Sequence, residues 1–394
     1  MHLRKFLALG LSILSAVAIS SPASADTIRD RQYWISDYGF NKVWETTKGA
    51  GVKVAVIDTG VDAQHPDLEK AMFGGTDVSS IGDASGYLPV GEVSHHGTMV
   101  ASLLAGRGHG EDEGVIGVAP EAELLSVSMA FGAQTLNTDD QVAAGIKWAV
   151  DAGAKVINLS LTRNSKDWPL SWDEAFLYAF ENDVVVVAAA GNRADGTEQV
   201  GAPATIPGVL VVAGVDRNAV ASSAASTAGL SISVAAPATD LVSAFPGGEY
   251  KIWSGSSGAA PIVSGLVALV RAKYPELDAN NVINRIIETA TQVGTENYSS
   301  EYGYGLIDPE KALSAKVASV TENPLGSLSE WIELYRKSQA PEDVPSGTIN
   351  TPIDSVEPVV TSSPDSGNLI MVLVYLAVGA LLLSSMLRGS RRRE

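Results

Sequence analysis

Short runs of apolar residues alternate with helical patterns across the middle of the chain. Residues 52–57 read Val-Lys-Val-Ala-Val-Ile and predict a buried strand that ends at Asp58. Further runs of this kind predict strands at residues 124–128, 156–161, 184–189 and 209–215. Between them lie helical patterns such as residues 139–152, where Val142, Ile146 and Ala149 share one side. This alternation predicts a three-layer αβα domain of the α/β class over residues 26–317, in which helices cover both faces of a mostly parallel central sheet.

Two polar residues come directly after predicted strands. Asp58 follows residues 52–57, and Asn192 comes shortly after residues 184–189. Ligands of parallel sheets bind beyond the carboxyl ends of the strands. We therefore expect a functional site at this edge of the sheet.

The N-terminus is typical of a secretory signal peptide. Arg4 and Lys5 precede an apolar run over residues 6–20, and Ala-Ser-Ala at residues 23–25 supplies the small side chains of a cleavage site. We expect residues 1–25 to be removed, which leaves Asp26 as the first residue. A retained N-terminal anchor is the alternative.

A second apolar run lies near the C-terminus. Residues 369–387 carry no charged side chain and are long enough to cross a hydrocarbon layer of about 30 Å as a helix. The arginines of residues 388–394 follow at once, which predicts a cytoplasmic tail and a domain outside the cell. The sequence therefore predicts a single-pass protein of the cell membrane; a buried core helix is the alternative.

Two segments connect the domain to this predicted helix. Residues 318–339 have the pattern of a short amphipathic helix, which either packs back on the domain or lies at the membrane interface. Residues 340–368 hold five prolines among Ser, Thr, Asp and Glu, and this composition predicts a linker.

Composition and charge remove several classes of function. The formal net charge is −18, and such acidity argues against nucleic acid as a partner, because phosphate binding needs clustered Lys and Arg. The 394 residues include no cysteine, which excludes disulfides, zinc–thiolate sites and a thiol nucleophile.

Three short segments carry an acid, a base and a nucleophile. Val-Ile-Asp-Thr-Gly-Val-Asp at residues 56–62 places Asp58 at a strand end. His-His-Gly-Thr-Met-Val-Ala begins at residue 95, and its second histidine, His96, opens a helix. Gly-Ser-Ser-Gly-Ala-Ala-Pro begins at residue 255, and Ser257 starts a long apolar helix. A serine hydroxyl attacks well only when a base takes its proton, and a carboxylate can hold that base in the right tautomer.

These blocks, in this order, resemble the signatures of the subtilisin family of serine endopeptidases, over about residues 34–313. The resemblance implies a subtilisin-like αβα domain that hydrolyses polypeptides through an acyl-enzyme. It also implies that Asp58, His96 and Ser257 form the catalytic triad. Asn192 matches the family's side-chain donor to the oxyanion, beside the backbone N–H of Ser257.

The resemblance also suggests where a peptide binds. Two segments are similar to the family's peptide-pairing edges, where an extended substrate adds as a strand. Their residues are Ser160, Leu161, Thr162, Ala130, Phe131 and Gly132. Thr162 stands where the family usually has glycine, Ser256 where it has threonine, and Gly258 where it has a bulkier residue. No cofactor or metal is implied. Structural calcium sites vary within the family, and no residue of this sequence is assigned to one.

Within the family, the layout most resembles the mycosins, which are C-terminally anchored subtilases associated with type VII secretion in actinobacteria. This resemblance implies the membrane complex of that secretion system as a partner. One alternative is a generic cell-surface subtilase that processes or degrades exported proteins, and another is a weakly active protease-fold scaffold. An α/β-hydrolase esterase is excluded, because its order is Ser…Asp…His and every histidine here precedes Ser257.

Overall fold

A computed structural model describes residues 27–131, 137–194, 196, 198–336, 349–350 and 356–359. Its centre is a seven-stranded sheet in the order β2-β3-β1-β4-β6-β7-β8, and every neighbouring pair in it is parallel. The strands are β1 (Lys53–Asp58), β2 (Met72–Asp77), β3 (Glu123–Ser128), β4 (Val156–Leu159), β6 (Val185–Ala189), β7 (Leu210–Val215) and β8 (Val234–Pro237). The predicted parallel sheet is confirmed.

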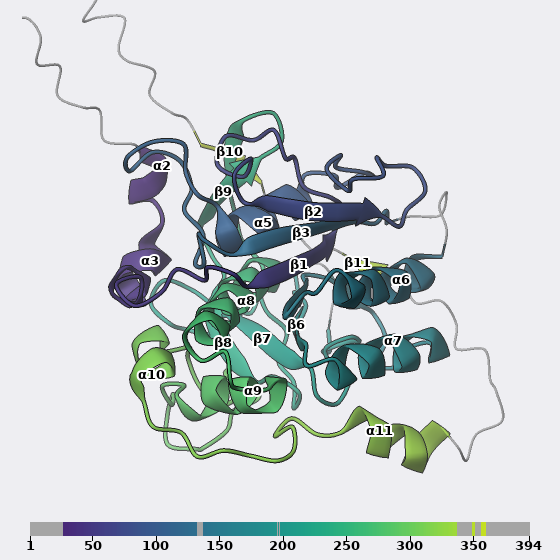
Figure 1. Cartoon of the computed structure of the whole chain (residues 1–394). Coiled ribbons are helices and arrows are strands. Elements are labelled where there is room, and N and C mark those ends of the chain that lie inside the picture. The colour runs from purple at the N-terminus through teal and green to yellow at the C-terminus, as the bar shows by residue number, and fades with distance from the viewer. Residues whose placement is uncertain are drawn as a thin grey trace, which may run out of the picture. The chain divides into compact units, whose positions relative to one another are not determined.

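Helices cover both faces of this sheet (Figure 1). One face is covered by α5 (His96–Ala105), α8 (Ser256–Lys273) and α9 (Ala279–Glu288), and the other by α6 (Thr138–Asp151) and α7 (Leu170–Glu181). Strand β1 explains how both faces are filled: Val54 and Val56 join the core under α5 and α8, while Ala55 and Ile57 join the core under α6. Side chains that alternate along a strand therefore build two cores.

Two strands of the sheet were not predicted from the sequence. Strand β2 is a half-exposed edge strand that contains two glycines, so it lacks an apolar run. A Cβ on Gly75 would clash with the carbonyl oxygen of Ser85, so a larger residue does not fit there. Strand β8 reads Val-Ala-Ala-Pro and is too short to show a pattern.

Short elements complete the unit that spans Ile28–Val359. The first helices bury Trp34 and Phe40 completely. These and the other short elements are α2 (Thr27–Asp30), α3 (Tyr33–Asp37), α4 (Phe40–Val43), β5 (Thr162–Arg163), β9 (Leu241–Phe245), β10 (Glu249–Trp253), α10 (Pro309–Ser314), β11 (Ile349–Asn350) and β12 (Glu357–Pro358).

The amphipathic segment packs back on the domain. It forms α11 (Leu328–Trp331) and a π-helical stretch, η2 (Ile332–Arg336), and α11 contacts α7. The ring of Trp331 lies 4.5 Å from that of Trp168, and Arg336 Nε lies 2.9 Å from Asp173 Oδ2. Of the two placements left open by the sequence, these contacts favour docking on the domain.

The predicted targeting segments lie outside the described residues. Residues 1–25, 369–387 and 388–394 therefore remain predictions, and of the linker at 340–368 only 349–350 and 356–359 are described. Among the helices of the described part, none has the length and apolar character that a membrane span requires.

Candidate active site

Asp58 and His96 form a buried hydrogen-bonded pair at the carboxyl edge of the sheet. Asp58 is the last residue of β1, and His96 is the first of α5. Nδ1 of His96 lies 2.8 and 2.9 Å from the two carboxylate oxygens. A carboxylate only accepts hydrogen bonds, so Nδ1 faces it as a donor, and in the neutral tautomer with this donor the lone pair is on Nε2. That Nε2 is buried and has no hydrogen-bond partner.

The hydroxyl of Thr59 sets the spacing of this pair. It accepts a hydrogen bond from the N–H of Gly97 at 2.9 Å and donates one to the carbonyl oxygen of Ser94 at 3.0 Å. The N–H of Thr59 itself donates to Asp58 Oδ1 at 2.7 Å. One side chain thus joins the end of β1 to the start of α5.

Ser257 lies in the first turn of α8, where the end of β4 holds it. Its hydroxyl donates to the carbonyl oxygen of Ser160 at 3.2 Å, and the hydroxyl of Ser160 donates to the carbonyl oxygen of Ser257 at 2.8 Å. Helix α8 packs against α5, and Trp253, shortly before α8, places its ring 5.7 Å from that of His96. The structure brings Asp58 and His96 into contact, but it shows no hydrogen bond from His96 to Ser257.

Asn192 is fastened to the residue that precedes Ser257. Its Oδ1 accepts hydrogen bonds from the N–H and the hydroxyl of Ser256, both at 2.8 Å. A backbone N–H can only donate, so the atom facing it must be the carbonyl oxygen, and the orientation of the carboxamide follows. The N–H of Gly191 donates to the same hydroxyl at 3.0 Å. Sequence reasoning treated Ser256 only as a departure from the family pattern and missed this role; the signal was a hydroxyl beside the nucleophile.

The predicted peptide edges differ in what the structure shows of them. Leu161 is buried, and Thr162 belongs to β5, whose Arg163 makes a buried ion pair with Asp139. The N–H of Ala130 donates to the side-chain oxygen of Gln141, and the carbonyl oxygen of Ala130 accepts from the amide of Gln141. Phe131 is described, whereas Gly132 lies outside the described residues.

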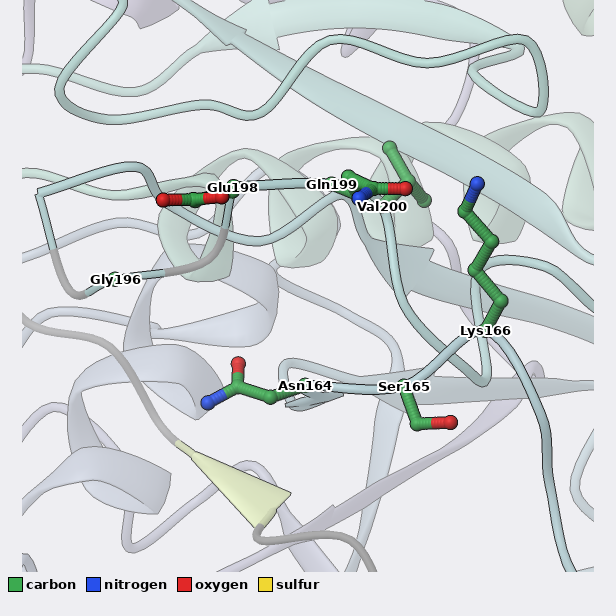
Figure 2. Close-up of a pocket in the computed structure, with 7 residues that line it drawn as sticks. All are labelled: Asn164, Ser165, Lys166, Gly196, Glu198, Gln199 and Val200. Atoms are coloured by element: carbon green, nitrogen blue, oxygen red, sulfur yellow. The ribbon is translucent and has the colours of Figure 1, made fainter.

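A pocket lies directly beyond β5 (Figure 2). One wall comes from the segment that follows β5 and the other from the loop that follows Asn192. The cavity volume is about 430 Å³, and its lining residues are Asn164, Ser165, Lys166, Gly196, Glu198, Gln199 and Val200. Both walls continue from segments that contain candidate site residues.

Two further histidines are at least partly buried, and one of them, His95, precedes His96 directly. Burial, and then the adjacent imidazole of His96, lowers the pKa of His95. His65 Nδ1 accepts the N–H of Asp67 at 3.1 Å, and its Nε2 lies 3.2 Å from a carbonyl oxygen of β10. Burial lowers the pKa of His65. Protonation of its Nδ1 would also break the bond to that N–H. In the described part of the chain, no cluster of three His, Asp or Glu is suited to hold a metal ion.

A parallel αβα domain with an aspartate–histidine pair at its carboxyl edge is an arrangement suited to a hydrolase that uses a base-activated nucleophile. The chain belongs to the subtilase family, whose sequence model matches residues 49–305. Subtilisin DY from Bacillus licheniformis is 38% identical over 267 residues, which are 67% of this chain and 92% of that relative. The chain is accordingly a subtilisin-like serine endopeptidase.

Solved structures with this fold include two that bear on function. Fervidolysin from Fervidobacterium pennivorans, described as a keratinolytic enzyme related to subtilisin, has a TM-score of 0.64 at 30% identity. That comparison covers 76% of this chain and 49% of fervidolysin, so the chain spans about half the length of that relative. MycP1, described as from the ESX-1 type VII secretion system, has a TM-score of 0.64 at 27% identity, over 77% of this chain and 91% of MycP1. The structural neighbours therefore include mycosins.

Proposed function

We propose that Asp58, His96 and Ser257 are the catalytic triad of a membrane-anchored, extracytoplasmic mycosin-like endopeptidase. The observation that carries this proposal is the contact of His96 Nδ1 with both oxygens of Asp58, which leaves a buried Nε2 without a partner. A base with one nitrogen anchored and the other unoccupied is suited to take a proton.

In the proposed reaction, Ser257 turns its hydroxyl from the carbonyl oxygen of Ser160 towards Nε2 of His96. Nε2 takes the proton as Oγ attacks the peptide carbonyl, and the carboxylate of Asp58 stabilises the imidazolium that forms. The imidazolium then gives its proton to the leaving amine, which leaves an acyl-enzyme on Oγ. Water, deprotonated by the same Nε2, releases the acid and restores the serine.

The negative charge of the tetrahedral intermediate needs donors that are already oriented. Asn192 is suited to this role, because Ser256 occupies its carbonyl oxygen and thereby directs its amide away from α8. The N–H of Ser257, in the first turn of the helix, is the second donor. Removal of one such donor typically costs about 3–4 kcal/mol of transition-state stabilisation.

For the substrate, we propose that an extended polypeptide pairs with the edge at Ser160–Thr162 and places one side chain in the pocket of Figure 2. The lining of that pocket includes both Lys166 and Glu198, so polar side chains fit it.

The predicted signal peptide, linker and apolar helix support anchoring of the domain outside the cytoplasm. The similarity to MycP1 supports a type VII secretion complex as the partner.

The test is covalent labelling with a fluorophosphonate probe. Wild type should be labelled, whereas Ser257→Ala should keep its fold and lose the label. Ser243→Ala is a matched control, because Ser243 is a buried serine whose hydroxyl has no hydrogen-bond partner. It should be labelled like wild type. Equal labelling of Ser257→Ala and wild type would reject the triad.

A further inference from the structure

The linker returns to the domain and forms a strand beside the candidate peptide edge. Ile349–Asn350, β11, pairs antiparallel with Thr162–Arg163, β5. Ile349 lies opposite Arg163, and Asn350 lies opposite Thr162. These two strands form a sheet of their own, so the partner that β5 has in this sheet comes from the linker.

Strand β11 has the direction that a peptide substrate would need in order to bring its carboxyl side to Ser257. As β11 advances from Ile349 to Asn350, its partner on β5 moves back from Arg163 to Thr162. Strand β11 therefore has the direction that leads from Arg163 towards Ser160, whose carbonyl oxygen accepts a hydrogen bond from the hydroxyl of Ser257. A peptide on this edge with the same direction would present its carboxyl side to the nucleophile.

The same linker is held a second time on the other flank of the site. Glu357–Pro358, β12, pairs antiparallel with β10, and the N–H of Val359 donates to the carbonyl oxygen of Tyr250 at 3.2 Å. Strand β10 ends at Trp253, whose ring packs on His96. Between β11 and Val356, where description resumes, lie residues 351–355. A chain of this length spans at most about 20 Å, so the two attachments lie within about that distance of each other.

The candidate catalytic residues are also closed to solvent. Asp58, His96, Asn192 and Ser257 each have 0% exposed surface. A polypeptide cannot reach Ser257 in this arrangement until some part of the chain moves. Of the described segments, β11 is the one that pairs with the edge a substrate would need.

We propose that the linker, through β11, occupies the substrate edge of its own active site and holds the endopeptidase in a state of low activity. This inference rests on the proposed function. Polypeptide substrates compete with β11 for β5, and a short tether gives β11 an effective concentration of about millimolar. Weak substrates are excluded, whereas a substrate with additional contacts displaces the linker. The endopeptidase is thereby limited to a narrow set of polypeptides.

The test uses the full chain purified in detergent and the variant Asn350→Pro. Proline has no N–H and disrupts a ladder, so the variant weakens β11 without altering the domain. Ser362→Pro is the matched control, because it introduces the same residue in the linker beyond β12. Each backbone hydrogen bond that is lost changes the ratio of covered to open edge by about two- to tenfold. The rate of fluorophosphonate labelling and kcat/KM for a short peptide should rise by that factor in Asn350→Pro only.

A second measurement separates competition from a structural effect. A synthetic peptide with the sequence of residues 345–358, at about millimolar concentration, should slow the labelling of Asn350→Pro again, and a scrambled peptide should not. If wild type is labelled, Ser257→Ala is not, and Asn350→Pro reacts at the wild-type rate, the linker inference fails while the triad stands. If Ser257→Ala is labelled like wild type, the proposed function itself fails. Cleavage of the wild-type linker between residues 349 and 359, absent in Ser257→Ala, would make it a substrate and overturn the inhibitory role.

Discussion

Asn192→Ala separates the catalytic use of this side chain from its structural use. The substitution removes the amide donor, so kcat should fall by about 10²–10³ with little change in KM, because the donor acts in the transition state. It also removes the acceptor at 2.8 Å from the N–H of Ser256, which lies in a fully buried first turn of α8. A buried donor without an acceptor costs about 1–3 kcal/mol, and each kcal/mol lowers Tm by about 2–4 °C in a large domain.

The assay needs both quantities from the same preparations. kcat and KM come from a quenched fluorescent peptide, and Tm comes from circular dichroism. Asn284→Ala is the control, since Asn284 is 5% exposed and donates to the carbonyl oxygen of Ala318 at 2.9 Å, in α9. It should lower Tm and leave kcat unchanged. If Asn192→Ala lowered Tm but kept kcat within about threefold of wild type, Asn192 would be a structural clamp and not an oxyanion donor.

Two further predictions concern stability. Burial holds the pKa of His65 below its ordinary value, so below about pH 6.5 the unfolded state binds more protons than the folded state. The free energy of unfolding therefore decreases as the pH is lowered, by up to about 1.4 kcal/mol per pH unit. Urea unfolding of His65→Gln should show a flatter pH dependence, and an unchanged slope would contradict this reasoning. Partial burial raises the pKa of Asp183, but hydrogen bonds from the guanidinium of Arg271 outweigh that effect and leave the pKa below its ordinary value. Asp183→Ala leaves the guanidinium of Arg271 buried without this carboxylate and should lower the free energy of unfolding in urea by about 1–3 kcal/mol. The loss is smaller than for a fully buried ion pair, because the side chain of Asp183 is 39% exposed. A loss below about 0.5 kcal/mol would refute this reasoning.

The parallel sheet could be predicted because its central strands are buried on both faces and read as mostly apolar runs. Strand β1 is predicted at residues 52–57 and is found at Lys53–Asp58. Strand β2 could not be predicted, because an edge strand with two glycines has neither an apolar run nor alternation. The run at 156–161 predicts a strand two residues longer than β4, since the chain leaves the sheet at Ser160 while its side chains stay buried.

Contacts between distant segments account for what the sequence could not predict about the site. Strand order places Asp58 and Asn192 at one edge, so their residue types and positions were visible in advance. The clamp of Ser256 on Asn192 depends on a contact across 64 residues, and no local pattern reports it. The pairing of β11 with β5 is a stronger case, because a proline-rich linker composition predicts coil, and only an unfilled strand edge elsewhere in the fold makes a ladder available.

The hydrophobic cores on the two faces of β1 differ in what they contribute to the candidate site. Both helices that carry His96 and Ser257 belong to the core on one face, whereas α6 and α7 fill the other face without contributing any member of the proposed triad. Substitutions in the second core can therefore alter thermal resistance while the reacting groups keep their spacing. Helix α7 already packs against an appended helix, α11. A lineage with this architecture can gain accessory segments on one side while preserving chemistry on the other.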